Sequence, residues 1–163
     1  MSKIIWLMLV MLLALVGCQS QAGGPANPAR LEEVAARGAE VMPFDLERTT
    51  HIFEKRDNGG LQQVISDDGD AAQIELIRAH LTEEAERFSQ GDFHDPQMIH
   101  GENMAGVHQL ITGYQRLDLE YSDLENGAQI LYTTTDAELV TALHTWFDAQ
   151  VSDHGAHAQD DRP

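Results

Sequence analysis

The sequence predicts an α+β domain built from two strand–strand–helix (ββα) units, which form a four-stranded, mostly antiparallel sheet with two long helices on one face. Two segments alternate apolar and polar residues on either side of an Asn-Gly pair, which is the pattern of a β-hairpin. Each is followed by a segment whose apolar residues recur at helical spacing. When Asp70 is aligned with Asp136, the apolar positions of the two helical segments coincide, which favours a repeated unit. Two amphipathic helices need an apolar surface to cover, and one face of a sheet supplies it.

The first 18 residues have the pattern of a bacterial lipoprotein signal peptide. Lys3 gives a positive start, and the apolar run Ile4–Val16 is too short for a comfortable membrane span. The run ends in Leu15-Val16-Gly17-Cys18, which resembles the lipobox in which the cysteine is lipidated. The alternative is an ordinary cleaved signal or a short anchor. Because Cys18 is the only cysteine, no disulfide can stabilise the folded domain.

The composition of the rest of the chain predicts a tether, a single domain and a tail. Residues 19–29 (QSQAGGPANPA) are small, polar or helix-breaking, which predicts a flexible tether. A single α+β domain is expected over residues 30–158, with a possible short helix at its start, and a disordered tail over residues 159–163. Gln19 follows the lipobox cysteine, which favours the outer membrane. We therefore expect a protein of the bacterial cell envelope, anchored to the membrane by lipid and facing the periplasm.

The first hairpin is expected over Thr50–Ile65, and its Asn58-Gly59-Gly60 turn should supply the positive φ values of a tight turn. The second runs from Leu117 to Tyr132 around Asn126-Gly127. Between the two units lies a long connection, residues 91–113, with a possible short helix after Met104.

The two long helices are predicted from their apolar stripes. Residues 71–89 carry one stripe, and residues 135–158 carry the other, starting at a cap formed by Thr135 or Asp136 and ending near Gly155. We expect Leu143 and Phe147 of the second helix to share a core with the equivalent positions of the first. The stripe residues are Ile74, Ile77, Leu81, Ala85 and Phe88 in one helix and Leu139, Leu143, Trp146, Phe147, Gln150 and Val151 in the other.

The chain is strongly acidic, with 27 Asp and Glu against 10 Lys and Arg and a formal net charge of −17. Such a surface argues against nucleic acid or anionic lipid as a binding partner. It suits a solvated envelope protein or one that attracts cations.

Eight histidines are conspicuous in an acidic chain of this length. Five of them fall in the long connection or in the tail, where His154 and His157 are spaced to face one ion. Imidazole suits zinc and copper, thioether adds a preference for reduced copper, and neighbouring carboxylates can orient the rings. The candidate metal ligands are His80, His100, Met104 (with Met98 as its alternative), His144, His154 and His157; the candidate supporting carboxylates are Glu84, Asp148 and Asp153.

Simpler interpretations of the same residues stay open. The histidines can be solvated surface residues, His80 and Glu84 can be an ordinary helix pair, and His51 is most simply a residue at the edge of the core. No HExxH, CxxC or CxxCH motif is present. The sequence also lacks GxSxG, a phosphate-binding glycine loop and the EF-hand spacing, so no catalytic residue is predicted.

Several segments between Val41 and Ala158 resemble a family of small uncharacterised bacterial envelope proteins. Some members of that family carry the name aspartate carbamoyltransferase. The enzyme of that name is a much larger two-domain α/β protein with a Ser-Thr-Arg-Thr phosphate loop, and neither that size nor that loop is found here. We therefore expect the chain to lack this activity. The segments that carry the resemblance are Met42–Leu46, Thr50–Phe53, Gly91–Phe93, Ile99–Gly101 and Phe147–Gly155.

Three functions are compatible with these features. The first is a non-enzymatic envelope lipoprotein that binds Cu or Zn through its histidines. The second is an acidic interaction module that docks an envelope protein and binds no metal. The third is a hydrolase that uses a metal-activated water, which is the weakest of the three because no motif places a general base.

Overall fold

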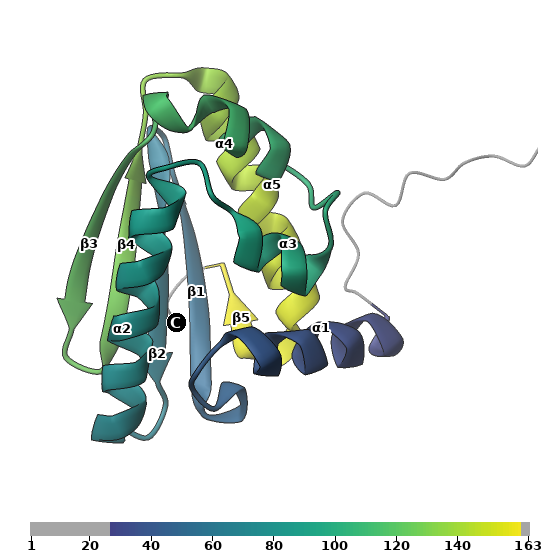
Figure 1. Ribbon diagram of the computed structural model, residues 1–163, viewed down its shortest axis with the longest axis vertical. Coiled ribbons are helices and arrows are strands. Elements are labelled where there is room, and N and C mark those ends of the chain that lie inside the picture. The colour runs from purple at the N-terminus through teal and green to yellow at the C-terminus, as the bar shows by residue number, and fades with distance from the viewer. Residues whose placement is uncertain (1–26, 161–163) are drawn as a thin grey trace, which may run out of the picture.

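Five strands form one mixed sheet in the order β3-β4-β2-β1-β5 in the computed structural model, which describes residues 27–160 (Figure 1). The predicted α+β class is confirmed. The strands are β1 (Thr49–Arg56), β2 (Gly59–Ser66), β3 (Asp118–Leu124), β4 (Gly127–Thr133) and β5 (Ala158–Gln159). The helices are α1 (Pro28–Val41), α2 (Ala71–Phe88), α3 (His94–His100), α4 (Val107–Gly113) and α5 (Ala137–His154). Three short 3-10 turns are η1 (Leu46–Arg48), η2 (Tyr114–Arg116) and η3 (Gly155–His157).

Both predicted hairpins are present, and they join through their second strands. β1 pairs antiparallel with β2, β3 pairs antiparallel with β4, and β2 and β4 lie side by side at the centre of the sheet. The Asn-Gly pairs meet the prediction only in part, because Gly59 has a positive φ of 154° whereas Gly127 does not. Among residues 27–160 no residue other than glycine has a positive φ, so Asn58 and Asn126 turn the chain without it. A Cβ at Gly127 would lie 2.0 Å from the backbone oxygen of Val64, so this glycine permits close packing of β4 on β2.

The prediction of four strands is wrong, because the chain after α5 adds a fifth. Gly155, with a φ of 57°, reverses the chain at the end of α5. Ala158 and Gln159 then pair in parallel with His51 and Ile52 of β1. The sheet is therefore mixed, and the end of the histidine-rich tail lies beside β1.

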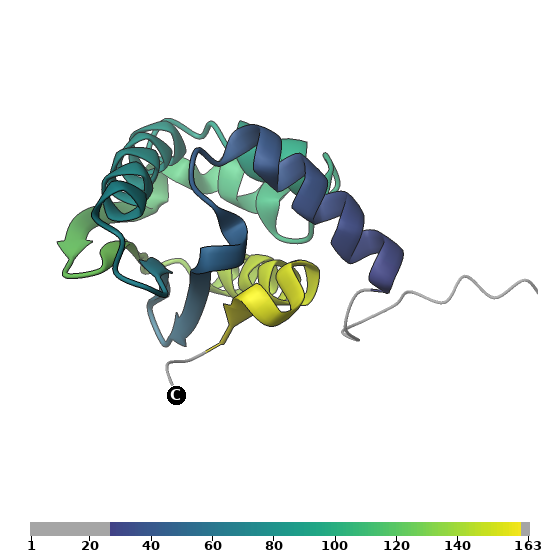
Figure 2. The same cartoon turned by 90° about the horizontal axis from the view of Figure 1, so that it is seen from below.

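The two long helices lie on the same side of the sheet, as predicted (Figure 2). Asp70 caps α2 by accepting a hydrogen bond from the Gln73 amide, and Asp136 caps α5 in the same way. Helix α2 packs on β4, β3 and β2, whereas α5 packs on β2 and β1. Four equivalent stripe residues are completely buried in one hydrophobic core; they are Ile77, Leu81, Leu143 and Phe147.

The remaining helices each add buried residues to this core. Helix α1 begins with Asn27 as its cap and Pro28 at its first position, where proline is well tolerated. It packs against α3 and α5, and α4 packs against α5 (Figure 1). No helix among residues 27–160 is long and apolar enough to cross a membrane. The predicted signal peptide and Cys18 lie outside the described residues.

Candidate functional site

Four histidines from four different elements meet where α1, α3 and the end of α5 approach the sheet. They are His51 of β1, His80 of α2, His100 of α3 and His154 of α5. The ring of His154 stacks on that of His51 with centroids 5.0 Å apart and meets the ring of His100 edge-on at 5.1 Å. Phe44 packs against His80, with ring centroids 5.6 Å apart.

The backbone geometry explains why His51 belongs to this group. His51 and Phe53 are two residues apart on β1, so their side chains point to the same face of the sheet. The ring centroids of Phe53 and of Phe147 on α5 are 5.1 Å apart, so this face of the sheet is the one that the helices cover. His51 is therefore directed into the interior, where it is only 4% exposed.

These side chains line a small internal cavity with ≈ 20 Å³ of space for the centre of a water molecule. That volume suits about one water molecule or a bare metal ion. Besides the four histidines, the lining residues that have polar or sulfur atoms in their side chains are Met42, Gln62, Glu84 and Gln150.

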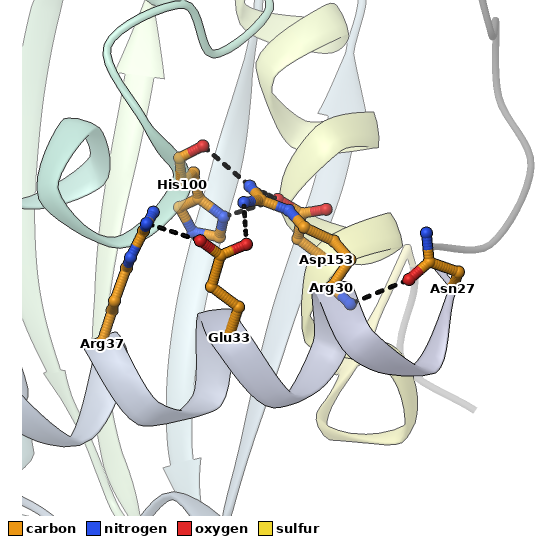
Figure 3. Close-up of polar contacts among 6 residues, drawn as sticks. All are labelled: Asn27, Arg30, Glu33, Arg37, His100 and Asp153. Atoms are coloured by element: carbon orange, nitrogen blue, oxygen red, sulfur yellow. Dashed lines mark hydrogen bonds and ion pairs between the residues drawn. The ribbon is translucent and has the colours of Figure 1, made fainter.

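Asp153 fixes His100 in place from the rim of the site (Figure 3). Its Oδ2 atom lies 2.9 Å from His100 Nδ1 and accepts a 2.6 Å hydrogen bond from Arg30 of α1. Arg30 also donates to the backbone oxygen of His100 at 2.7 Å, so it ties α1 to both α3 and α5. This contact orients the imidazole of His100 and leaves its Nε2 as the nitrogen not engaged by Asp153.

Replacing Asp153 by Asn is expected to destabilise the protein at neutral pH. Burial would raise the pKa of Asp153, but hydrogen bonds from His100 and Arg30 outweigh this and lower the pKa from 3.8 to about 2. Because the folded-state pKa is the lower one, this stabilisation is present above pH 3.8 and is lost as the pH falls to about 2. We expect Asp153→Asn to cost about 2 kcal/mol in urea unfolding at pH 7.

The same experiment at low pH supplies the check on this prediction. The difference between wild type and Asp153→Asn should shrink as the pH approaches 2. Asp148→Asn is the matched control, since Asp148 is exposed and pairs only with Lys55 among the described residues. An equal loss in both variants would contradict the role assigned to the Arg30–Asp153–His100 contacts.

Two polar atoms of the cavity lining have no hydrogen-bond partner among the described residues, namely His51 Nδ1 and Gln150 Oε1. Buried polar atoms without partners are rare in folded proteins, and they commonly mark a site for water, an ion or a ligand. Burial and the neighbouring His80 lower the pKa of His51 from 6.5 to about 4. Burial also lowers the pKa of His154 well below its usual value, with His51 and His100 adding to the effect. Both rings are therefore neutral at pH 7.

Glu84 lies at the far side of the cavity in a chain of buried polar groups. Its carboxylate is 3.6 Å from His80 Nε2 and accepts a 3.4 Å hydrogen bond from Gln62, which in turn accepts one from the Tyr132 hydroxyl. Burial raises the pKa of Glu84, although His80 opposes the shift. The surroundings therefore disfavour charge of either sign.

A larger pocket of ≈ 330 Å³ opens on the outer side of the same histidines. His51 and His154 line both the pocket and the inner cavity, so they form the wall between them. Glu32, Glu47 and Asp153 contribute carboxylates, and the apolar lining comes mainly from α1 and η1. A pocket of this size falls in the range of small-ligand sites.

The structure brings together about half of the predicted site residues. His80, His100, His154, Asp153 and Glu84 gather around or beside the cavity. His157 lies apart, at the rim of the outer pocket, where its Nε2 atom is 3.7 Å from Glu47.

Three further predicted residues are not at the cavity. His144 donates from Nε2 to the backbone oxygens of Arg56 and Gly59, at 3.1 and 2.9 Å, and so holds the first hairpin. Met104 is buried in the hydrophobic core and does not line the cavity. Asp148 is exposed on α5 and pairs with Lys55 of β1.

The sequence does not predict the other residues of the site, namely Arg30, Met42, Gln62 and Gln150, and it favours the edge of the core for His51. Strand alternation with Phe53 is the signal that could have placed His51 in the interior. Gln150 stood in the apolar stripe of α5, and a polar residue in such a stripe is itself a sign of a buried polar site. The contacts of Arg30 and Met42 depend on where α1 packs and leave no sequence signal.

The described residues contain no group of three or more His, Asp or Glu side chains already arranged to hold a metal ion. Comparison with known proteins adds no identity: no family model, curated protein or solved structure matches the chain.

Proposed function

We propose that this protein is a non-enzymatic lipoprotein of the bacterial envelope that binds a transition-metal ion, Cu or Zn, in the histidine-lined cavity. The observation that supports this most is the unpaired Nδ1 of His51, in a cavity also lined by His154 and by the carboxylate-oriented ring of His100. The lipobox that ends at Cys18 supports the proposed location in the bacterial envelope.

The protonation state of these rings suits a metal ligand. Imidazole binds a metal through its neutral form, so a ring that is already neutral gives up no proton on binding. Burial favours this form in both His51 and His154. A buried histidine whose other nitrogen bonds a carboxylate, as His100 does with Asp153, is the usual arrangement of an oriented metal ligand.

Binding requires a local rearrangement of the rings. The planes of His51 and His154 are nearly parallel, at 18°, whereas ligands of one ion direct their nitrogens to a common point. His154 occupies the last turn of α5 and lines the outer pocket as well as the cavity, so open space lies beside its ring. We infer that His154 turns to join His51 and His100 on the ion.

The outer pocket gives a route to the cavity. Its carboxylates and the net charge of −17 raise the local concentration of cations. A cation that enters the pocket reaches His51 and His154, which separate the pocket from the cavity.

Titration of the metal-stripped full chain tests this proposal. Calorimetry with Zn²⁺, and anaerobic competition with a chromogenic chelator for Cu⁺, should show one ion bound per chain. His154→Ala should weaken binding about 100-fold or more, whereas His144→Ala, which removes an imidazole from the same helix outside the cavity, should bind as wild type does. Absence of uptake of both ions, or equal affinity of the two variants, would overturn the proposal.

The exposed edge of the sheet favours a second function, that of an acidic docking module. β3 is an edge strand whose backbone can pair with another chain, and Asp118, Glu120 and Asp123 are exposed along it. These charges suit a basic extended segment of an envelope protein. If the chain takes up neither metal, this becomes the better-supported function.

The predicted ββα units account for the sheet and the two long helices, and other elements surround the proposed metal site. We infer that β1-β2-α2 and β3-β4-α5 are two copies of one unit, because their helices start at equivalent Asp caps and bury equivalent residues. The elements outside these units, α1, α3 and the tail after α5, supply Arg30, Met42 and His100 and close the proposed metal site.

A further inference from the structure

The outer pocket lies between α1, η1 and the end of α5, and its walls are apolar. Leu31 of α1 packs against the chain reversal after α5, since a Cβ at Gly155 would lie 3.4 Å from two of its methyl carbons. Leu46 of η1 packs on α1, where a Cβ at Gly38 would lie 3.0 Å from its Cδ1 atom. Val34, which is only 1% exposed, completes the wall. The pocket is therefore suited to the hydrocarbon part of a ligand.

The rim of this pocket carries carboxylates. Glu32 and Glu47 line the pocket and are exposed, so their charges lie at its mouth. Glu32 has no ion-pair partner within residues 27–160, and the Glu47 carboxylate has only the 3.7 Å contact with His157. The third carboxylate of the lining, Asp153, already accepts a hydrogen bond from Arg30. The described residues that line the pocket include no Lys or Arg, so its mouth favours a positively charged group.

The inner end of the pocket carries an unmet hydrogen bond. His51 lines the pocket, is only 4% exposed, and its Nδ1 atom has no hydrogen-bond partner in the described part of the chain. A buried polar atom without a partner has lost the hydrogen bond that water gave it, so a ligand group that supplies one gains affinity. A hydroxyl group both donates and accepts, so it can pair with Nδ1 in either tautomer of the ring. A charged group at this depth would lose its hydration instead.

We propose that the outer pocket binds a small aliphatic amine that carries a hydroxyl group at its other end. The ammonium group lies at the rim near Glu32 and Glu47, the chain lies against Leu31 and Leu46, and the hydroxyl pairs with His51. This inference goes beyond the proposed metal-binding function and does not require an ion in the inner cavity. At ≈ 330 Å³ the pocket is at the lower end of the range for small-ligand sites, which suits one short chain.

Three compounds that differ in one group each test the proposal on the full chain, kept metal-free with a chelator. Aminohexanol, with its two groups at opposite ends, should bind once per chain in calorimetry and shift the NMR amide signals of Gly155 and Ala156, which line the pocket. Hydroxyhexanoate replaces the ammonium by a carboxylate and should bind about tenfold more weakly or worse, because the rim then repels it. Hexylamine lacks the hydroxyl and should also bind about tenfold more weakly.

Two tryptophan variants of α1 test the location. Ala35 is exposed and lines the pocket, whereas the next residue, Ala36, is exposed and is not part of the lining. Ala35→Trp should weaken aminohexanol binding about tenfold or more, because the indole ring occupies the pocket. Ala36→Trp is the matched control and should bind as wild type does. Glu47→Gln should weaken binding by about fivefold at most, since an exposed ion pair contributes little.

The outcomes separate this inference from the proposed function. Equal affinity for aminohexanol and hydroxyhexanoate, or for aminohexanol and hexylamine, would overturn it. Equal affinity of Ala35→Trp and Ala36→Trp for aminohexanol would also overturn it. Each of these results leaves metal binding in the inner cavity standing, and failure to take up Cu or Zn leaves the amine site standing, because the titrations contain no metal.

Discussion

Replacing Phe147 by alanine should lower the free energy of unfolding by about 3–5 kcal/mol. Phe147 is completely buried and packs against three aromatic rings, those of Phe53, Tyr132 and Trp146, at centroid distances of 5.1, 5.9 and 5.5 Å. Its ring also fills the space over Gly60, where a Cβ would lie only 2.4 Å from it. The alanine variant loses these contacts and leaves a cavity between α5 and the sheet.

Urea unfolding followed by tryptophan fluorescence and by circular dichroism measures this loss. Leu76→Ala is the matched control, because Leu76 lies on α2 but is 40% exposed. Its effect should be much smaller, as for other surface truncations. Equal losses in the two variants would mean that Phe147 is not the centre of the core between α5 and the sheet.

Acidification from pH 6.5 to pH 4 should destabilise the protein by up to about 3 kcal/mol through His51 alone. Burial and His80 lower the pKa of His51 from 6.5 to about 4 in the folded state. Below pH 6.5 the unfolded chain therefore binds a proton that the folded chain rejects, so stability falls as the pH falls. His154, whose pKa is also lowered by burial, shifts stability in the same direction.

His51→Leu isolates this effect, since leucine removes both the titrating ring and the unpaired Nδ1 atom. The variant should lose less stability between pH 6.5 and pH 4 than wild type does, as measured by urea unfolding of the metal-free chain. His108→Gln, which removes an exposed imidazole, is the control for loss of a histidine as such. A pH dependence that is unchanged in His51→Leu would refute the buried, neutral state of His51.

The hairpins and long helices could be predicted because their signals are local. Alternation in β1–β2 and β3–β4, the caps Asp70 and Asp136, and the apolar stripes of α2 and α5 each depend on neighbouring residues only. β5 had no such signal. It has two residues, too few for alternation, and it exists because the Gly155 reversal carries the chain to the free edge of β1.

The site, like the fold, could be predicted only where its signals are local. The sequence showed that an acidic chain with one cysteine, placed at the end of an apolar leader, carries eight histidines and no catalytic motif. It could not show which histidines meet, because residues as far apart as His51, His100 and His154 come together only when their elements pack. His144 shows the limit well, since it lies on the same helix as His154 but donates to carbonyl oxygens of the β1–β2 hairpin.

The sequence alone therefore determined the element types, the charge and the pool of candidate ligands, all of which follow from composition and short-range spacing. Tertiary structure decided the rest: the fifth strand, the closure by α1 through Arg30, and the enclosure of Met42 with four histidines. The physical reason is that burial and partner choice depend on contacts between segments distant in the chain. Those contacts set which rings are neutral and which nitrogen of His51 stays unpaired.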